Sequence, residues 1–321
     1  MIMSSCIHTG PLNEVAYSCG IGSPVGSSGW YGLDVGSSYL LVSPDPGKAD
    51  KSVIDYAKKI NAKAIDIEDN YGLSNARGIT EKYSDKFVDY TAKHGILNVP
   101  KGKKKIIFDK LDPEISSISF RSNGDGLEID DIDISRTGGF YVHKSHPKYG
   151  GVSVIDPSGH DSLAREKEYR KVLSEAEYLS GFFSLLTGKR IRVSERAKNR
   201  MRESINKSVF ATDEVIVHEA LGHDFQDNLG ITDTEGLSTK ILGTRPYSVP
   251  FLEYLNTAVT RDVLGKDVQG YSSLQPIGDS FMRKKNIRSM DAQKIINPRV
   301  REGIDSEFNK ELEKEYYKQF N

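Results

Sequence analysis

Residues 215–224 read Val-Ile-Val-His-Glu-Ala-Leu-Gly-His-Asp, and this stretch carries the strongest chemical signal in the chain. The pattern H-E-x-x-H on a helix places two imidazoles on one face, where both can bind one zinc ion while the Glu acts as a general base. Here His218 and His223 are five residues apart instead of four. At about 100° per residue, five positions place the two side chains roughly 140° apart in a regular helix, too far to hold one ion.

A local distortion of the helix would remove this conflict. A single-turn π-bulge absorbs one extra residue and lets positions i and i+5 face the same way. Gly222 occupies the extra position, and a glycine has no side chain to crowd a widened turn. The sequence therefore predicts a distorted helix at Leu221–His223 if the two His residues bind metal. The alternative is a regular helix with two unrelated polar His residues.

Composition restricts the class of protein. The 321 residues suffice for two domains, and the net charge of −1 gives no general attraction to nucleic acid or to a membrane. The first residues show no signal peptide, and no apolar run approaches the roughly 20 residues that span a bilayer. Cys6 and Cys19 are the only cysteines, which excludes a disulfide framework and a Cys-rich zinc site. Any metal must be bound by His and carboxylates.

The N-terminal part is predicted to be mixed and mainly β. Apolar residues recur at helical spacing within residues 50–96. Asn123-Gly124 is typical of a hairpin turn, and the acidic strand after it is predicted to carry a bulge at Asp130-Asp131. Strand patterns occur at Tyr39–Val42, Lys105–Phe108, Ser116–Phe120, Leu127–Ile134, Phe140–His143 and Val152–Ile155.

From residue 160 the pattern becomes helical, which places a domain boundary near residue 150. Asp161 or Ser162 is predicted to cap a long helix that stops at Gly188. Thr212 or Asp213 is predicted to cap the helix that carries the His-Glu motif, with Gly230 at its end. Further helices are expected from Glu235 to Leu242, from Ser248 to Gly265, and from Asp305 to Phe320.

A catalytic zinc site needs a third protein ligand and keeps one position for water. Glu235, twelve residues past His223, is the first choice; Glu253 and then Asp227 are the alternatives. Glu219 is the predicted general base. Tyr271 or Tyr247 is the predicted donor to the oxyanion that forms during hydrolysis.

Two resemblances support this interpretation. Residues 218–223 are similar to the H-E-L-L-G-H element of the dipeptidyl peptidase III family, in which both His residues bind zinc. More widely, the order of the His-Glu motif, Gly230, Glu235, a Glu253/Asn256 pair, Arg261, Leu264-Gly265 and Tyr271 resembles the effector-type zinc metallopeptidases. These occur as injected bacterial effectors and as C-terminal domains of Rhs-type toxins. The resemblance implies that His218, His223 and Glu235 are ligands and that Glu219 is the base.

Two other functions compete with this hypothesis. The extra residue could have destroyed the ligand geometry, which would leave an inactive pseudo-peptidase that binds a protein partner. Converging His rings would favour the enzyme, and rings on opposite helix faces would favour the pseudo-peptidase. The basic residues between Lys189 and Lys207 could contact nucleic acid, but interleaved Glu195 and Glu203 favour a solvated helix face.

The sequence thus predicts an α+β protein with a β-rich domain over residues 1–150, a zincin-like metallopeptidase domain over 151–275 and a charged extension over 276–321. The expected reaction is zinc-dependent hydrolysis of a protein or peptide substrate, with no nucleic-acid partner and no membrane span. The expected setting is a bacterial cytoplasm before secretion or injection into a target cell.

Overall fold

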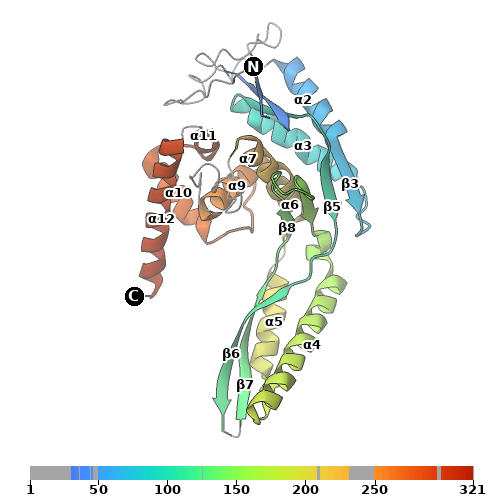
Figure 1. Ribbon diagram of the computed structural model, residues 1–321, viewed down its shortest axis with the longest axis vertical. Helices are drawn as coiled ribbons and strands as arrows, with labels where there is room; N and C mark the ends of the chain where they lie inside the picture. The colour runs from blue at the N-terminus through green and yellow to red at the C-terminus, as the bar shows by residue number, and fades with distance from the viewer. Residues whose placement is uncertain are drawn as a thin grey trace.

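The computed structural model describes residues 30–320, except 36, 44, 46–49, 125, 208–209, 231–248 and 295–297. The chain mixes helices and strands, as the sequence predicts. Its shape is a body from which one long arm projects (Figure 1). The arm contains β6, β7, α4 and α5, whereas the His-Glu helix lies in the body where the arm begins.

A small antiparallel sheet begins the described chain. It consists of β1 (Tyr31–Asp34), β2 (Ser38–Val42) and β4 (Ile96–Pro100), in the order β1-β2-β4. Its apolar face packs against α2 (Lys51–Ala64) and α3 (Ala76–Lys93) around the buried Trp30. Residues 50–96 are therefore two helices rather than one helical segment. Between them lies β3 (Ile65–Asp69), whose Ile-Asp-Ile-Glu-Asp alternation is a strand pattern.

The central sheet lies beside the His-Glu helix. Its order is β3-β5-β9-β8, where β5 is Lys104–Phe108, β9 is Val152–Ile155 and β8 is Gly139–Tyr141. β3, β5 and β9 are parallel, and β8 is an antiparallel edge strand. The boundary suggested near residue 150 falls between two paired strands, because β5 and β9 form one sheet.

The arm has its own core. β6 (Glu114–Asn123) and β7 (Gly126–Ser135) form a hairpin, and β10 (Ile191–Val193) adds to β7 in parallel. One face is covered by α4 (Ser162–Thr187) and α5 (Glu195–Lys207), which bury Val172, Met201 and the apolar residues of β7. Asp161 caps α4 and Gly188 ends it, as predicted. The register shift opposite Ser119–Phe120 confirms the bulge in the acidic strand, at Asp130.

The His-Glu helix is largely buried in the body. It begins as α6 (Thr212–Val215), widens into a π-helix, η4 (Ile216–His223), and ends as α7 (Asp224–Asn228) before Gly230. The first residue of the helix is Thr212, but neither Thr212 nor Asp213 is the N-cap; Ala211 takes that position and makes no side-chain capping bond. Ile216, Val217 and Leu221 lie in the main core, together with residues of α3, β5 and β9.

In the described part of the chain after residue 248, four helices complete the body. α9 (Val249–Leu264) packs across η4, and Gly265 follows it with φ 65°, as the predicted stop requires. α10 (Leu274–Lys285), α11 (Ser289–Gln293) and α12 (Pro298–Phe320) pack on the far side of α9 around Phe251 and Phe308. The boundary suggested at residue 275 falls inside α10. The helix predicted from Glu235 to Leu242 lies outside the described residues.

The π-helix depends on a close contact at Gly222. A Cβ atom built on Gly222 would lie 1.8 Å from Oδ1 of Asn256 on α9, so no other residue fits without a shift. Nδ2 of Asn256 donates a hydrogen bond of 2.9 Å to the carbonyl oxygen of His218. The same asparagine therefore satisfies a backbone group of the widened turn and forbids a side chain at the inserted position.

We expect Gly222→Ala to destabilise the protein by about 1–3 kcal/mol, the usual cost of overpacking a buried site. Gly181→Ala is the matched control, because Gly181 lies exposed in α4 with nothing near its Cβ position, and alanine there should stabilise the helix by about 0.5–1 kcal/mol. Denaturant unfolding measures both changes. Adding Asn256→Ala to Gly222→Ala should recover part of the loss; additive costs would show that Asn256 is not the obstacle.

Candidate metal centre

Two imidazoles and one carboxylate converge at η4. His218, His223 and Glu253 each offer a ligand atom, and these atoms lie within 4.8 Å of one another. Nε2 of His218 lies 2.9 Å and Nε2 of His223 lies 3.5 Å from Oε2 of Glu253. Neighbouring ligands of a tetrahedral zinc are separated by about 3.3 Å, given bonds of about 2.0–2.1 Å, so small movements of these side chains would complete the site.

The widened helix produces this convergence. The ring centroids of His218 and His223 are 4.9 Å apart, although the residues are five positions apart in the sequence. The predicted distortion is therefore confirmed, and it extends over the whole of Ile216–His223. These rings lie on one side of the helix, which is the arrangement expected of a metal site rather than of a pseudo-peptidase that has lost its ligand geometry.

A buried amide orients the His223 ring. Nδ1 of His223 lies 3.0 Å from Oε1 of Gln226, and Nε2 of Gln226 donates to the carbonyl oxygen of Leu252 at 3.2 Å. The ring then donates through Nδ1 and presents Nε2 to Glu253. Metal-binding histidines characteristically hold their second nitrogen in this way. Gln226 also joins the His-Glu helix to α9 next to Glu253.

The electrostatics of the three groups are coupled. Burial lowers the pKa of His223, but the hydrogen bond to Glu253 and the charges of Glu253 and Glu219 outweigh burial and raise that pKa to about 9. Burial likewise raises the pKa of Glu253, while its hydrogen bonds to His218 and His223 hold that pKa well below its usual range. Glu253 is thus an anion without metal, and its carboxylate is the hard ligand that a His-rich zinc site accepts.

Of the three candidates for the third ligand, the structure brings Glu253 to the two histidines. Glu235, the first choice, lies outside the described residues. Asp227, the third choice, is used elsewhere: its carboxylate accepts from Oη of Tyr141 at 2.8 Å and pairs with His143 at 2.7 Å. Asp227 thereby anchors the segment after β8 to the helix and is not one of the converging groups.

Asp224 directly after the motif also has a structural role. It is 3 % exposed and pairs with Nζ of Lys104 at 2.5 Å and Nζ of Lys144 at 2.8 Å. Burial raises its pKa, but the two lysines lower it by more, so the group stays charged. A buried carboxylate needs such partners. Asp224 fixes the end of the widened segment to β5.

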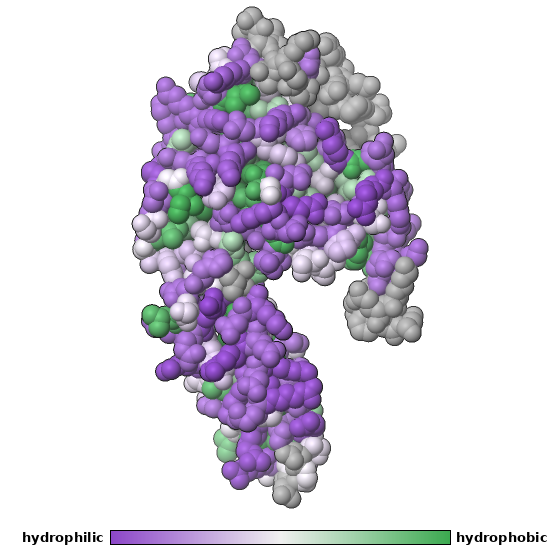
Figure 2. Space-filling view, turned by 180° about the vertical axis from the view of Figure 1, so that it is seen from behind, coloured by the Kyte–Doolittle hydropathy of each residue, from purple (hydrophilic) through white to green (hydrophobic). Residues whose placement is uncertain are grey.

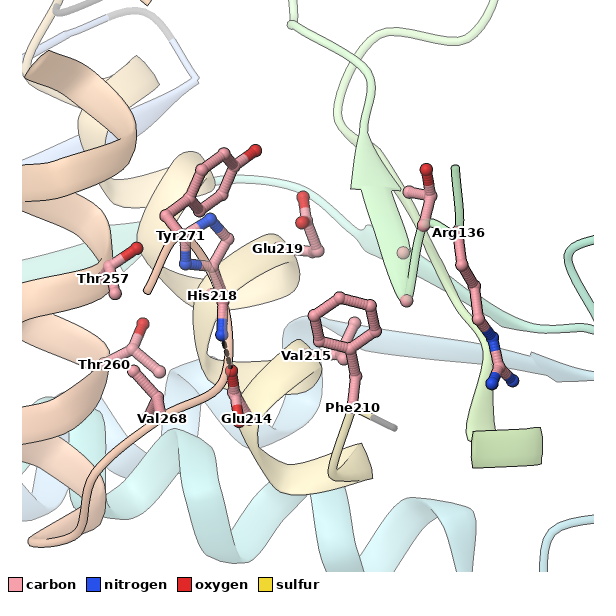
Figure 3. A pocket seen from close by; sticks show the side chains of 14 residues that line it. Arg136, Phe210, Glu214, Val215, His218, Glu219, Thr257, Thr260, Val268 and Tyr271 are labelled. Carbon is pink, nitrogen blue, oxygen red and sulfur yellow. Dashed lines mark hydrogen bonds between the residues drawn. The ribbon is translucent and has the colours of Figure 1, made fainter. Parts of the chain in front are cut away.

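Glu219 and Tyr271 face a cavity next to the three converging groups (Figure 3). The cavity has a volume of about 230 Å³, and its lining also includes His218, Phe210 and Thr257. Oε2 of Glu219 lies 3.7 Å from Nε2 of His223. The ring of Tyr271 stacks on the ring of His218 at 5.7 Å. The structure therefore brings both predicted catalytic residues to the candidate metal ligands. Tyr247 lies outside the described residues.

A buried carboxylate holds the segment before Tyr271. Oε1 of Glu214 accepts from the backbone N–H of Gly270 at 2.6 Å, and Nε2 of Gln275 donates to the Gly270 carbonyl oxygen at 2.9 Å. Tyr271 itself has φ 49°, a conformation that only surrounding contacts make stable for a bulky residue. These bonds fix where the phenol ring stands.

Sequence reasoning missed Gln226, Glu214 and Asn256 as supporting residues. Gln226 is three positions after His223 and Glu214 four positions before His218, so both lie on the ligand side of the helix and helical spacing could have found them. Asn256 follows Glu253 by three positions, so it lies on the same side of its helix. Its partner, the His218 carbonyl, is visible only in three dimensions.

In the basic stretch from Lys189 to Lys207, the basic residues of α5 are paired with carboxylates. Arg196 lies 3.5 Å from Asp130, Arg200 pairs with Asp131, and Lys198 lies 2.8 Å from Glu195. Arg196 and Arg200 thereby lie along the bulged acidic strand of the arm. This arrangement matches the solvated helix face that the sequence favours.

Comparison with known proteins found no matching family model, no matching curated protein and no matching solved structure. Among the described helices, none has both the length and the apolar composition needed to cross a bilayer.

We expect the purified protein to bind about one zinc ion per chain, the stoichiometry of a three-residue catalytic site. His218→Ala, His223→Ala and Glu253→Ala should each weaken binding by about 10²-fold or more, because each removes a ligand from a buried site. His146→Ala, at an exposed histidine, is the control. Metal analysis and calorimetric titration measure the effect. Glu235→Ala is the decisive comparison: loss of zinc there, with retention in Glu253→Ala, would overturn the assignment of Glu253.

Proposed function

We propose that this protein is a zinc-dependent peptidase that hydrolyses peptide bonds in a protein or peptide substrate. The observation that carries the proposal is the convergence of His218, His223 and Glu253. The two histidines come from a π-helix, and a regular helix would not bring them together. The donor set suits zinc, since two imidazoles and a carboxylate with an orienting amide are typical of a catalytic zinc site with an open position. A bound zinc would supply a polarised water and an electrophilic partner for the substrate carbonyl.

Glu219 is the group placed to move protons. Its carboxylate is next to His223 and lines the cavity, with 14 % of its side chain exposed. A general base must lie within reach of the attacking water, and the same group can then return the proton to the leaving amine. Its position beside the ligands, rather than among them, separates its role from that of Glu253.

Tyr271 is the group placed to stabilise charge on the carbonyl oxygen. The phenol stands over His218 at the rim of the cavity. Gly270, the residue before it, is held by a hydrogen bond that it donates to Glu214 and one that it accepts from Gln275. A donor held in position before the reaction stabilises an oxyanion without the cost of reorganisation. The strained backbone of Tyr271 agrees with such a fixed role.

A peptide substrate is favoured by the edge strand beside the cavity. β8 pairs with β9 on one side and with no other described strand, and Gly138 and Gly139 line the cavity. An extended peptide can add to such an edge through backbone hydrogen bonds. Gly139 lets β8 approach the helix, because a Cβ there would lie 2.6 Å from Cγ1 of Val215. The cavity would then receive a side chain of the bound peptide.

The role as an injected effector or toxin is supported by the sequence resemblance alone. The pseudo-peptidase hypothesis predicts zinc binding without turnover, or no zinc binding at all. The converging rings favour the enzyme over this alternative. Substitutions at Glu219 and Tyr271 distinguish the two hypotheses.

Glu219→Gln should keep the zinc stoichiometry of the wild type and lose about 10²–10⁴-fold in kcat, since the amide cannot accept the proton. The same substitution at Glu253 should instead reduce metal binding, because Glu253 is a ligand. Hydrolysis of a peptide mixture, followed by mass spectrometry, measures the activity. Undiminished hydrolysis by the Glu219→Gln variant would remove Glu219 from the mechanism.

Tyr271→Phe should lower kcat by on the order of 10²-fold with little change in KM, as expected for a donor that acts mainly in the transition state. Tyr56→Phe, at a tyrosine with 55 % exposure on α2, is the matched control and should behave as the wild type. A rise in KM alone would show that Tyr271 binds substrate and does not stabilise the oxyanion.

A further inference from the structure

The free end of the arm carries a cluster of exposed apolar side chains. This tip patch consists of Phe120 on β6 and Tyr178, Phe182, Leu185 and Leu186 on α4. Leu185 is 86 % exposed, Tyr178 74 % and Leu186 66 %. Exposed apolar side chains are ordinary when scattered, but a contiguous group marks an interaction site.

The patch is a local departure from the pattern of α4. The buried stripe of this helix contains Val172, Ala176 and Ser180. At about 100° per residue, Tyr178, Phe182 and Leu185 lie on the opposite, outward face. Earlier in the helix that face carries the exposed Lys167 and Lys171. The outward face therefore turns apolar only in the last turns, at the end farthest from the body (Figure 1).

Aromatic contacts join the helix to the sheet edge at the tip. The rings of Phe120 and Phe183 are 5.4 Å apart, and those of Phe182 and Phe183 are 5.8 Å apart. Phe183 thus connects Phe182 of α4 with Phe120 of β6, so the patch spans two elements. From behind, the arm is largely hydrophilic, with apolar atoms near its lower end (Figure 2). The core of the arm lies on the other face of α4, so internal packing does not explain the patch.

Basic side chains border the patch. Lys189, Arg190 and Arg192 are exposed, and no ion pair with another described residue involves them. A Cβ atom on Gly126 would lie 2.5 Å from the Arg190 carbonyl oxygen, so this basic run lies against the hairpin turn. Glu128 near the same turn is paired with Arg121 at 3.4 Å. In α5, by contrast, Arg196 and Arg200 pair with Asp130 and Asp131 of the acidic strand.

We propose that the tip of the arm docks on a membrane surface that contains anionic lipids. Apolar side chains at a projecting end can enter the boundary between headgroups and acyl chains, and the cations beside them match anionic headgroups. Tyr178 lines an open groove with residues 112–115. Phe182, Leu185 and Leu186 stand exposed at the projecting end, which matches a flat anionic surface better than a protein partner. Docking of this kind is interfacial and needs no spanning helix. The proposal is independent of the peptidase function.

Co-sedimentation with vesicles tests the proposal. The full chain should bind vesicles of phosphatidylcholine with phosphatidylserine, bind phosphatidylcholine alone much more weakly, and lose affinity as salt rises. The pair Leu185→Glu/Leu186→Glu should weaken binding at least about tenfold, as should Lys189→Glu/Arg190→Glu. Leu163→Glu is the matched control: Leu163 is 73 % exposed at the opposite end of the same helix, and its variant should bind as the wild type.

Circular dichroism and the zinc content of each variant establish that the body is intact. Failure of the wild type to bind anionic vesicles would overturn the proposal, as would equal losses in the Leu163 and Leu185/Leu186 variants. Concentration-dependent self-association that disappears in Leu185→Glu/Leu186→Glu, without any vesicle binding, would instead identify the patch as a contact between copies of this chain.

Discussion

A hydrogen bond from Asn256 to the carbonyl oxygen of His218 holds the arrangement on which the candidate site depends. A π-helical segment leaves backbone groups less well paired than an α-helix and survives only where its surroundings compensate. Here α9 provides that compensation. It bonds to the widened backbone through Asn256 and provides Glu253 to both imidazoles. The inserted residue must be glycine because the same asparagine fills the space where a side chain would lie.

The structure also gives the acidic residues after the motif partners away from the candidate metal centre. Asp224 and Asp227 lie on the following turn, and each is already paired with groups from the sheet and the segment after β8. A buried carboxylate that lost those partners would be strongly destabilising. The helix thus presents one side to the candidate metal centre and uses its last turn as an anchor. These anchoring contacts hold the rings of His218 and His223 in place against α9.

Sequence reasoning could predict the elements whose signals are local. The cap at Asp161, the stop at Gly188 and the bulge at Asp130 each depend on neighbouring residues, and all three are present. The π-helix was predictable because a five-residue spacing cannot otherwise bring His218 and His223 together. The sequence predicts one helical segment over residues 50–96 and misses β3, because the short alternating pattern of β3 lies between two helical patterns of similar composition.

The third ligand could not be fixed from the sequence, since spacing along the chain does not report which helix crosses another. Glu253 reaches the histidines because α9 packs across η4, and this crossing is set by apolar residues such as Val259 and Val263, not by the carboxylate. The resemblance favoured Glu235, whereas the packing of α9 favours Glu253. Domain limits were equally hidden, because strands on both sides of residue 150 share one sheet.

The root of the arm has a mechanical consequence for the cavity. Arg136 follows β7 and Phe210 follows α5, so the two segments that return from the arm to the body both line the space next to Glu219. Arg136 also bonds to Glu168 on α4 and to Ser158, which ties it to the base of the arm. The base of the arm therefore forms part of the wall of the cavity. A load on its tip that tilts α4 would be transmitted to the place where a substrate side chain would lie.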